Sequence, residues 1–140
     1  MSRSKRIGTR GESQVVAAFR TFGLEADRKP LKGSEDEGDI WVLLPNGEQI
    51  MIEVKTGKQT KGYSRTTKRE WLRQTKAESE NSGEEGFLII NSYGRGIIDS
   101  EVWSADGHSF WYLDEFVEFI LGRNGNEKHQ DAAGSNRSGT

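Results

Sequence analysis

The chain has no cysteine and only 2 prolines among its 140 residues. Without cysteine it can form neither a disulfide framework nor a thiolate metal site. No apolar run approaches the roughly 18 residues of a membrane span, and the basic N-terminus lacks the apolar segment of a secretory signal. Hydrophobic residues make up only 32% of the chain, which predicts one modest core. We therefore expect a soluble, cytoplasmic protein that does not associate with membranes.

Excess positive charge is also missing, because the formal net charge is −2 at pH 7. The charges are nevertheless segregated along the chain. Between residues 55 and 76 every charged residue is basic except Glu70, whereas acids are concentrated from residue 78 onward. Such segregation can give an acidic protein one positive face, and a polyanion responds to that local field. A solvated basic helix without a partner is the plainer alternative.

Hydrophobic periodicity predicts one folded domain, residues 9–122, between a flexible basic segment at 1–8 and a disordered polar tail at 123–140. Helices are predicted at 9–23 with a Thr9–Glu12 capping box, at 65–82, and at 114–121 with Asp114 as the cap. Strands are predicted at 24–31, 39–44, 49–55, 86–91, 97–103 and 109–113. This order of elements predicts an α/β fold.

The strands predicted at 39–44 and 49–55 are joined by Pro45-Asn46-Gly47. Their apolar residues must share one face of the sheet if that sheet is to have a core side. A two-residue turn would place the two apolar sets on opposite faces, whereas a three-residue loop that ends in a glycine of positive φ aligns them. The three-residue loop pairs Val42 with Ile50, Ile40 with Ile52, and Asp39 with Glu53.

That register places the carboxylates of Asp39 and Glu53 on directly opposed residues, whose Cβ atoms are about 4.5–5.5 Å apart. Like charges this close repel each other and raise a carboxyl pKa. A divalent cation removes the conflict, because Mg²⁺ takes oxygens from one or two carboxylates and completes its shell with water and phosphate. Lys55 lies two residues beyond Glu53 and therefore on the same face. The pattern predicts a metal site beside an ammonium; a solvent-facing strand edge with a weak salt bridge is the alternative.

Together these residues resemble the PD-(D/E)xK nuclease superfamily, and most of all the archaeal and phage-type Holliday junction resolvases. The resemblance rests on four segments: Arg10-Gly11-Glu12, Arg28-Lys29, Gly38-Asp39-Ile40 and Ile52-Glu53-Val54-Lys55-Thr56. It departs from the family at Gly38, where the family often has proline. The resemblance implies a restriction-endonuclease-like core, in which a central mixed β-sheet is flanked by helices.

The resemblance also implies roles for individual residues. Glu12, Asp39 and Glu53 would hold Mg²⁺, for which Mn²⁺ would substitute, with the backbone carbonyl of Val54 as a further ligand. Lys55 would be the catalytic lysine, and Gln74 is a possible accessory residue. For Glu12, a purely structural role as the third helical position of a capping box is an equal alternative.

The activity that the resemblance implies is metal-dependent hydrolysis of DNA at four-way junctions by a homodimer, since two strands must be cut symmetrically. The residues expected to contact DNA phosphates are Arg6, Arg10, Lys58, Lys61, Arg65, Lys68, Arg69 and Arg73. Three alternatives stay open. The chain could be another endonuclease of this fold, of nicking, flap or repair type. It could be a non-catalytic DNA-binding protein with this fold, or an unrelated small α/β binding module.

Overall fold

The computed structural model describes residues 3–30 and 37–123, with side chains in the first helix described from Arg10 onward. The helices are α1 (Arg3–Thr21), α2 (Arg65–Ser82) and α3 (Leu113–Leu121), with 3-10 turns η1 (Gly57–Thr60) and η2 (Ile97–Asp99). The strands are β1 (Glu25–Arg28), β2 (Ile40–Leu43), β3 (Gln49–Lys55), β4 (Gly86–Ile90), β5 (Glu101–Ser104) and β6 (Phe110–Tyr112). None of the helices described is long and apolar enough to cross a membrane.

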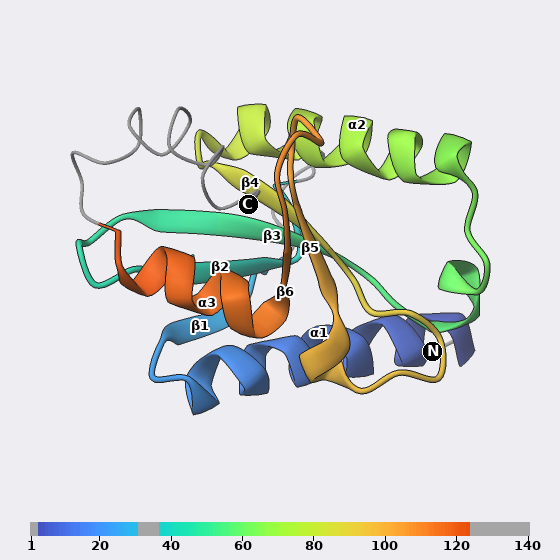
Figure 1. Cartoon of the computed structure of the whole chain (residues 1–140), viewed down its shortest axis with the longest axis horizontal. Helices are drawn as coiled ribbons and strands as arrows, with labels where there is room; N and C mark the ends of the chain where they lie inside the picture. Colours follow the sequence, from blue (N-terminus) through green and yellow to red (C-terminus); the bar gives the residue numbers. More distant parts are fainter. Residues whose placement is uncertain (1–2, 31–36, 124–140) are drawn as a thin grey trace.

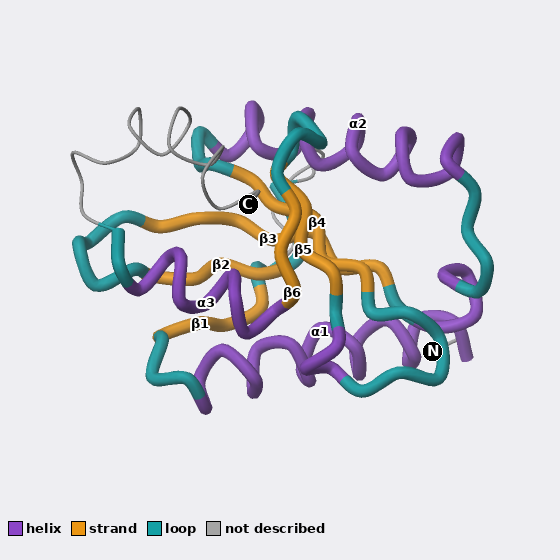
Figure 2. The backbone as a smooth tube through the Cα atoms, viewed as in Figure 1, coloured by secondary structure: helices purple, strands orange, loops and turns teal. Residues whose placement is uncertain are grey.

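All six strands form one sheet in the order β1-β2-β3-β4-β5-β6. Strands β3 and β4 run parallel, and every other neighbouring pair is antiparallel. The parallel pair requires a crossover connection, which α2 supplies. Figure 1 shows α1 and α3 on one side of the sheet and α2 on the other, and Figure 2 traces the same layers. The predicted α/β fold, with a central mixed sheet flanked by helices, is confirmed.

One face of the sheet, the core face, packs against α1 and α3 and holds the main hydrophobic cluster. Ile40 of β2 and Ile52 of β3 point to this face, and both are fully buried. The ring of Phe116 in α3 meets Phe87 of β4 edge-on, with ring centroids 4.8 Å apart, and Phe19 of α1 at 6.4 Å. Aromatic and aliphatic burial of this kind supplies the main favourable free energy of folding.

The opposite face, the α2 face, carries a smaller apolar cluster of Trp71 from α2 with Leu88 and Ile90 from β4. Glu53 and Lys55 of β3 point to this face, because side chains alternate between the two faces along a strand. Glu53 is only 3% exposed. Helix α2 therefore shields the Glu53 side chain from water.

The β2–β3 hairpin has the predicted register. Val42 pairs with Ile50, and Ile40 pairs with Ile52. The Leu44 N–H donates to the Glu48 carbonyl at 2.7 Å, which leaves three residues in the loop. The last of them, Gly47, has a φ of +90°, a conformation that residues with a side chain rarely adopt.

Helix ends were predicted with mixed success. Helix α2 matches its predicted bounds: the Ser64 side chain accepts from the Thr67 N–H at 3.1 Å, and Gly83 follows with a φ of +72°. Helix α1 begins at Arg3 rather than at residue 9, so the predicted Thr9–Glu12 capping box is wrong. Lys and Arg are good helix formers, and they let the helix continue toward the N-terminus.

The start of α3 and one strand also differ from the prediction. Tyr112, not Asp114, is the N-cap of α3, and its N–H donates to the Glu115 carboxylate at 3.0 Å. A carboxylate three positions into a helix can satisfy the cap N–H, and this contact displaces Asp114 to the second helical position. The strand predicted at 97–103 is split into η2 and β5. Residues 32–36, between the strands predicted at 24–31 and 39–44, lie outside the described residues.

Arg123 is the first residue of the tail predicted at 123–140, and its side chain packs against the described fold. Arg123 is only 4% exposed, and its guanidinium pairs with Glu85 and lies 3.9 Å from a Glu48 oxygen. It also lies over the ring of Phe119, 5.5 Å from the centroid. Arg123 therefore belongs to the folded domain, because a buried guanidinium needs such partners. The rest of the predicted tail, 124–140, lies outside the described residues.

Candidate active site

Asp39 lies just before β2, at the point where the hairpin meets the C-terminal end of β3. Its backbone N–H donates to the Ile52 carbonyl at 3.1 Å, and its Oδ2 accepts from the Val54 N–H at 2.8 Å. The preceding Gly38 has a φ of +100°, and a Cβ on it would lie 2.3 Å from Met51 Cε. Proline holds φ near −65° and could not occupy this position, which gives a physical reason for the departure from the family pattern.

Glu53 lies within β3 on the α2 face, as predicted, beside Lys55. The Glu53 Oε2 is 3.1 Å from Lys55 Nζ. The other oxygen, Oε1, is buried and has no hydrogen-bond partner among the residues that the structure describes. A buried carboxylate oxygen without a donor costs free energy, so this atom needs a cation or a proton.

The pKa values of both acids reflect this shortage of positive charge. Burial first, and then repulsion from Glu53, raise the pKa of Asp39 well above its ordinary value, with a smaller contribution from Glu12. Burial first, and then the neighbouring carboxyl of Glu78, raise the pKa of Glu53 to about 8, against the opposing effect of Lys55. Asp39 and Glu53 are therefore brought together in space, as the predicted register requires, and one ammonium does not neutralise them.

Glu12 comes from α1, on the other side of the sheet. Gly11 brings the two elements close, because a Cβ on it would lie 2.5 Å from Thr56 Oγ1 at the end of β3. The Glu12 Oε1 accepts from Arg28 Nε at 3.0 Å, so this carboxylate is held by a guanidinium. Its charge nevertheless contributes to the raised pKa of Asp39. Glu12 is thus close enough to Asp39 to affect its pKa, while its carboxylate is hydrogen-bonded to Arg28.

The side chains at this site could supply two carboxylate ligands to a divalent metal ion. Among residues 10–30 and 37–123, no three His, Cys, Asp or Glu side chains are arranged to hold a metal ion. Two carboxylates do meet, and Mg²⁺ requires only one or two when water and phosphate fill the remaining positions. The observed contact of Val54 at the site is its N–H, which fixes Asp39. Asp39 and Glu53, with the partnerless Glu53 Oε1, therefore form a two-carboxylate site that a cation would complete.

Lys55 continues the site into α2. Its Nζ donates to Gln74 Oε1 at 3.0 Å, so the residue predicted as a possible accessory contacts the predicted catalytic lysine. The Gln74 Nε2 then donates to Glu78 Oε2 at 3.0 Å. Glu78 is only 1% exposed and was missed in the sequence, where it was counted among the acids that follow the basic segment. Its spacing of four from Gln74, and of seven from the buried Trp71, is the signal that places it on the same helix face.

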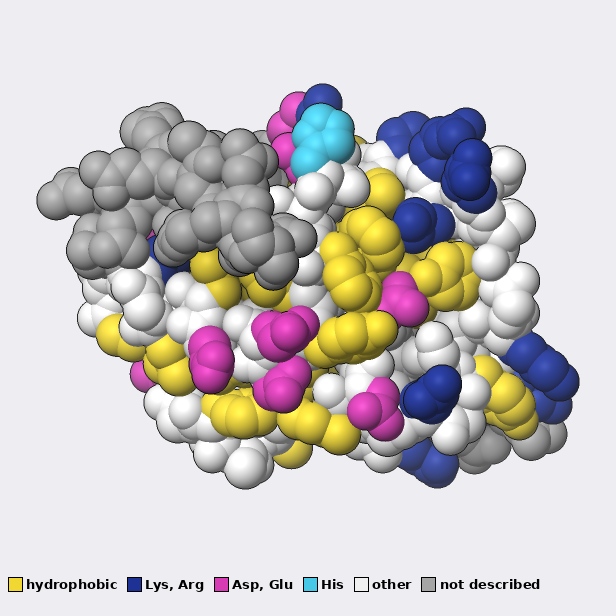
Figure 3. All heavy atoms as spheres, viewed as in Figure 1, with side chains coloured by type: hydrophobic (Ala, Val, Ile, Leu, Met, Phe, Trp, Pro, Cys, Tyr) yellow, Lys and Arg dark blue, Asp and Glu magenta, His cyan; other side chains and the backbone are white. Residues whose placement is uncertain are grey.

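The predicted DNA-contacting residues lie mostly on the surface. Arg10, Lys58, Lys61, Arg65, Arg69 and Arg73 are exposed. Figure 3 shows basic side chains gathered where α2 begins, and acidic ones gathered over the region of α3. The side chain of Arg6 lies outside those described.

Three of these cations have intramolecular contacts. Lys68 Nζ lies 3.8 Å from the centroid of the Trp103 ring, and Lys61 Nζ lies 5.9 Å from that of Tyr93. Arg73 pairs with Glu70 at the surface, which lowers the pKa of Glu70. Exposed pairs of this kind are weak, so they leave the cations accessible to an anion.

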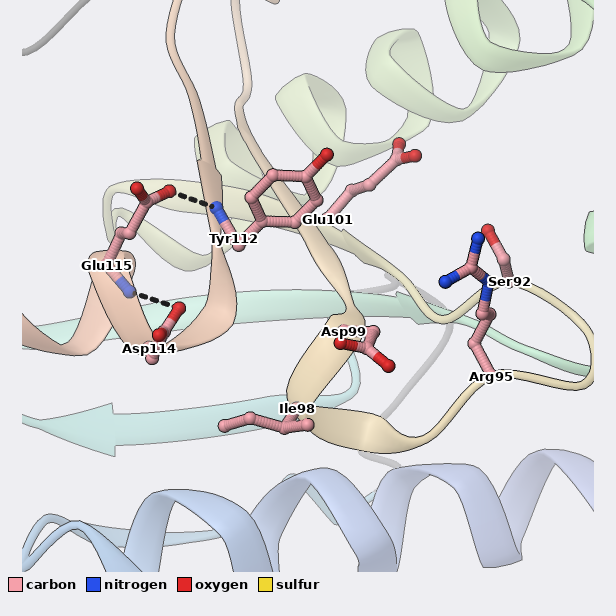
Figure 4. A pocket seen from close by; sticks show the side chains of 8 residues that line it. All are labelled: Ser92, Arg95, Ile98, Asp99, Glu101, Tyr112, Asp114 and Glu115. Atoms are coloured by element: carbon pink, nitrogen blue, oxygen red, sulfur yellow. Dashed lines mark hydrogen bonds between the residues drawn. The ribbon is translucent and has the colours of Figure 1, made fainter.

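A separate pocket of about 450 Å³ lies beside β5, β6 and η2 (Figure 4). Its lining includes Arg95, Tyr112 and the carboxylates of Asp99, Glu101 and Asp114, and none of the predicted catalytic residues. Acids outnumber bases in its wall. The pocket therefore disfavours a phosphate and lies apart from the candidate site.

These observations define a mixed α/β sheet protein in which Glu53 and Lys55 of β3 meet the carboxylate of Asp39, which lies just before β2. No protein-family model matches the chain, and no curated protein matches it. One solved structure with a similar fold is Hjc of Archaeoglobus fulgidus, a Holliday junction resolvase from an archaeal hyperthermophile. The identity is 20%, the match covers 70% of this chain and 77% of that one, and the TM-score is 0.49. An identity this low does not transfer a function.

Proposed function

We propose that this protein is a metal-dependent endonuclease that hydrolyses phosphodiester bonds in branched DNA, with four-way junctions as its substrate. The observation that carries this proposal is the meeting of the half-buried Asp39 with the buried Glu53 beside Lys55. Perturbed carboxyl pKa values next to a fixed ammonium are typical of functional sites, because a sheet gains no stability from such a group.

Asp39 and Glu53 would hold Mg²⁺, or Mn²⁺ in its place, and Glu12 would complete the site when it leaves Arg28. The ion would supply a Lewis acid for the phosphoryl oxygen and would lower the pKa of a bound water. The chain's own residues do the rest. The Val54 N–H keeps the Asp39 carboxylate turned toward β3. Lys55 has three N–H donors, of which Glu53 and Gln74 use two, and the third is available to the attacking water or to a phosphoryl oxygen.

DNA would be held by the exposed basic residues around the start of α2, together with Arg10. Such contacts are made to phosphates, so they select duplex shape and branching rather than sequence. Cutting two strands of a junction symmetrically requires two active sites, and we therefore propose a homodimer with two-fold symmetry.

A cleavage assay tests the proposal. Four-way, flap and linear DNA of matched sequence would be incubated with the protein in Mg²⁺, beside the Asp39→Asn and Glu53→Gln variants. We expect cutting of the four-way junction by the native chain, none by either variant, and junction binding by all three. Preferential cutting of flap or linear DNA would identify another endonuclease of this fold. Full activity in either variant would refute the proposed site.

A non-catalytic DNA-binding protein is the second candidate function. Two observations favour it: Arg28 holds the Glu12 carboxylate, and no three-ligand metal cluster is formed within the described part of the chain. Junction binding without metal-dependent cutting of any of the three substrates would support this candidate.

A further inference from the structure

Glu78 is a buried acid that the proposed mechanism does not use. It lies in α2 with 1% of its surface exposed, and its carboxyl group is close enough to Glu53 to raise the pKa of that residue. The other buried side chains of this helix face are Trp71, which packs on β4, and Thr75, whose hydroxyl donates to the Trp71 carbonyl at 2.8 Å. A carboxylate buried beside another carboxylate destabilises a fold. Stability therefore does not explain why Glu78 is at this position.

The hydrogen bonds of Gln74 supply an explanation. Its amide lies between two charged groups: Oε1 accepts from the Lys55 ammonium at 3.0 Å, and Nε2 donates to Glu78 Oε2 at 3.0 Å. An amide has one accepting end and one donating end. With a cation on one side and an anion on the other, only one of its two flipped orientations is favourable.

We propose that Glu78 is a positioning residue, which holds the amide of Gln74 so that its oxygen faces the Lys55 ammonium. In this role Glu78 acts through Gln74, whose Nε2 donates to the Glu78 carboxylate. This inference rests on the proposed function, because it gives the orientation of Lys55 a purpose in phosphodiester hydrolysis.

Holding Gln74 in this orientation fixes the position of the Lys55 ammonium group. A lysine side chain has high rotamer entropy, and one partner alone, Glu53, would leave the Nζ group free to turn. Two oxygen partners, Glu53 Oε2 and Gln74 Oε1, restrict it. An amide that is free to flip would offer its NH₂ group to the ammonium for part of the time, and this arrangement is repulsive.

The first test compares Glu78→Gln with Glu80→Gln, an exposed acid on the same helix that serves as the matched control. A glutamine at 78 accepts and donates equally well, so it no longer dictates the orientation of Gln74. We expect kcat for junction cleavage to fall about tenfold, the scale of one lost hydrogen bond, with KM and junction affinity unchanged. Thermal stability should hold or rise, because a buried charge is removed. An unchanged kcat, or a fall in kcat matched by a loss of stability, would overturn the inference.

A double-mutant cycle with Gln74→Met asks whether Glu78 acts through the amide. Methionine keeps the volume of glutamine and removes both hydrogen-bonding groups. Adding Glu78→Gln to Gln74→Met should cause no further fall in kcat. A further fall as large as that of Glu78→Gln alone would show that Glu78 acts by another route.

The third readout does not depend on activity. In the full chain labelled with ¹⁵N-glutamine, the side-chain amide signal of Gln74 is assigned by its loss in Gln74→Met. That signal should shift in Glu78→Gln and stay in place in Glu80→Gln. If the native chain cuts no DNA, the proposed function fails while this signal still decides the inference. An unmoved Gln74 signal in Glu78→Gln would refute the positioning role, whatever the activity.

Discussion

The two faces of the sheet bury different kinds of side chain. The core face buries apolar side chains against α1 and α3, with aromatic rings in edge-on contact around Phe116. The α2 face buries a smaller apolar cluster and a charged group made of Asp39, Glu53, Lys55 and Glu78. Burial of apolar side chains stabilises the fold on either face, whereas burial of the charged group costs free energy.

Strand β3 shows how closely these two tasks can be combined. Ile52 and Val54 pack in the core, while Glu53 and Lys55, which alternate with them, form the charged group. One strand therefore supplies both the stability of the fold and the chemistry of the site, with one face for each. Substitutions on the two faces should have opposite consequences, and the following expectations test that contrast from the largest effect to the smallest.

On the core face, Phe116→Ala should lower the free energy of unfolding by about 3–5 kcal/mol, because it removes a buried ring and leaves a cavity. Chemical denaturation measures this loss. Below the unfolding midpoint, the kcat of the folded fraction should stay close to that of the native chain. A loss of less than about 1 kcal/mol would show that the ring cluster is not the centre of the core.

On the α2 face, Glu53→Gln should lower the rate of junction cleavage by at least about 100-fold, the scale of a single electrostatic contact to a transition state. Its free energy of unfolding should hold or rise, because a buried carboxylate without a full set of partners is removed. Cleavage kinetics and denaturation on the same preparation measure both quantities. A variant that is less stable than the native chain would contradict the contrast between the faces.

The pH dependence of stability should carry the sign of a raised carboxyl pKa. The pKa of Glu53 rises from an ordinary 4.5 to about 8 in the fold, so the folded state binds more protons than the unfolded state between these values. Stabilisation from the neutral form is complete below pH 4.5 and is lost as pH rises through 8. The melting temperature in a chelator should therefore fall across this range, and Mg²⁺ should raise it more near the upper end. A Mg²⁺ effect that is equal at both ends, or a fall as large in Glu53→Gln as in the native chain, would contradict this expectation.

Salt dependence tests the basic surface with the smallest expected change. The paired substitution of Arg65 and Arg69 by alanine should reduce the slope of log affinity against log salt by about 2, or roughly 0.9 per phosphate contact. Arg95→Ala is the control, because Arg95 lies in the acidic pocket beside β5 and β6. Junction-binding measurements at several salt concentrations give the slopes. Equal slopes in the native and paired variants would remove these two residues from the DNA contact.

The hairpin and its charged residues were predictable from the sequence because their geometry is local. Strand parity and the three-residue loop ending in Gly47 are sufficient to bring Asp39 to Glu53 and to place Lys55 on the same face. Gln74, which family resemblance alone suggested as a possible accessory residue, contacts Lys55.

Other features depend on contacts between residues distant in sequence. The burial of Glu78 follows from how α2 lies on the sheet, which a mostly polar helix does not reveal. By composition Arg123 belongs to a polar tail, yet it contacts Glu85 and Phe119 of the folded domain. The salt bridge from Arg28 to Glu12 joins β1 to α1 and decides the state of the predicted third metal ligand. The contacts of Arg123 and Arg28 do not follow from periodicity or spacing, and for Glu78 the helical spacing indicates the helix face but not its burial.

The central claim is that Asp39 and Glu53 share a divalent cation, and anomalous X-ray scattering from crystals grown with Mn²⁺ tests it most directly. The account predicts an anomalous peak about 2.0–2.2 Å from oxygens of both carboxylates, the distance expected for a small divalent ion. It also predicts that the peak disappears in crystals of Glu53→Gln. Native crystals with no peak between these carboxylates, or with a peak bound only elsewhere, would contradict the account.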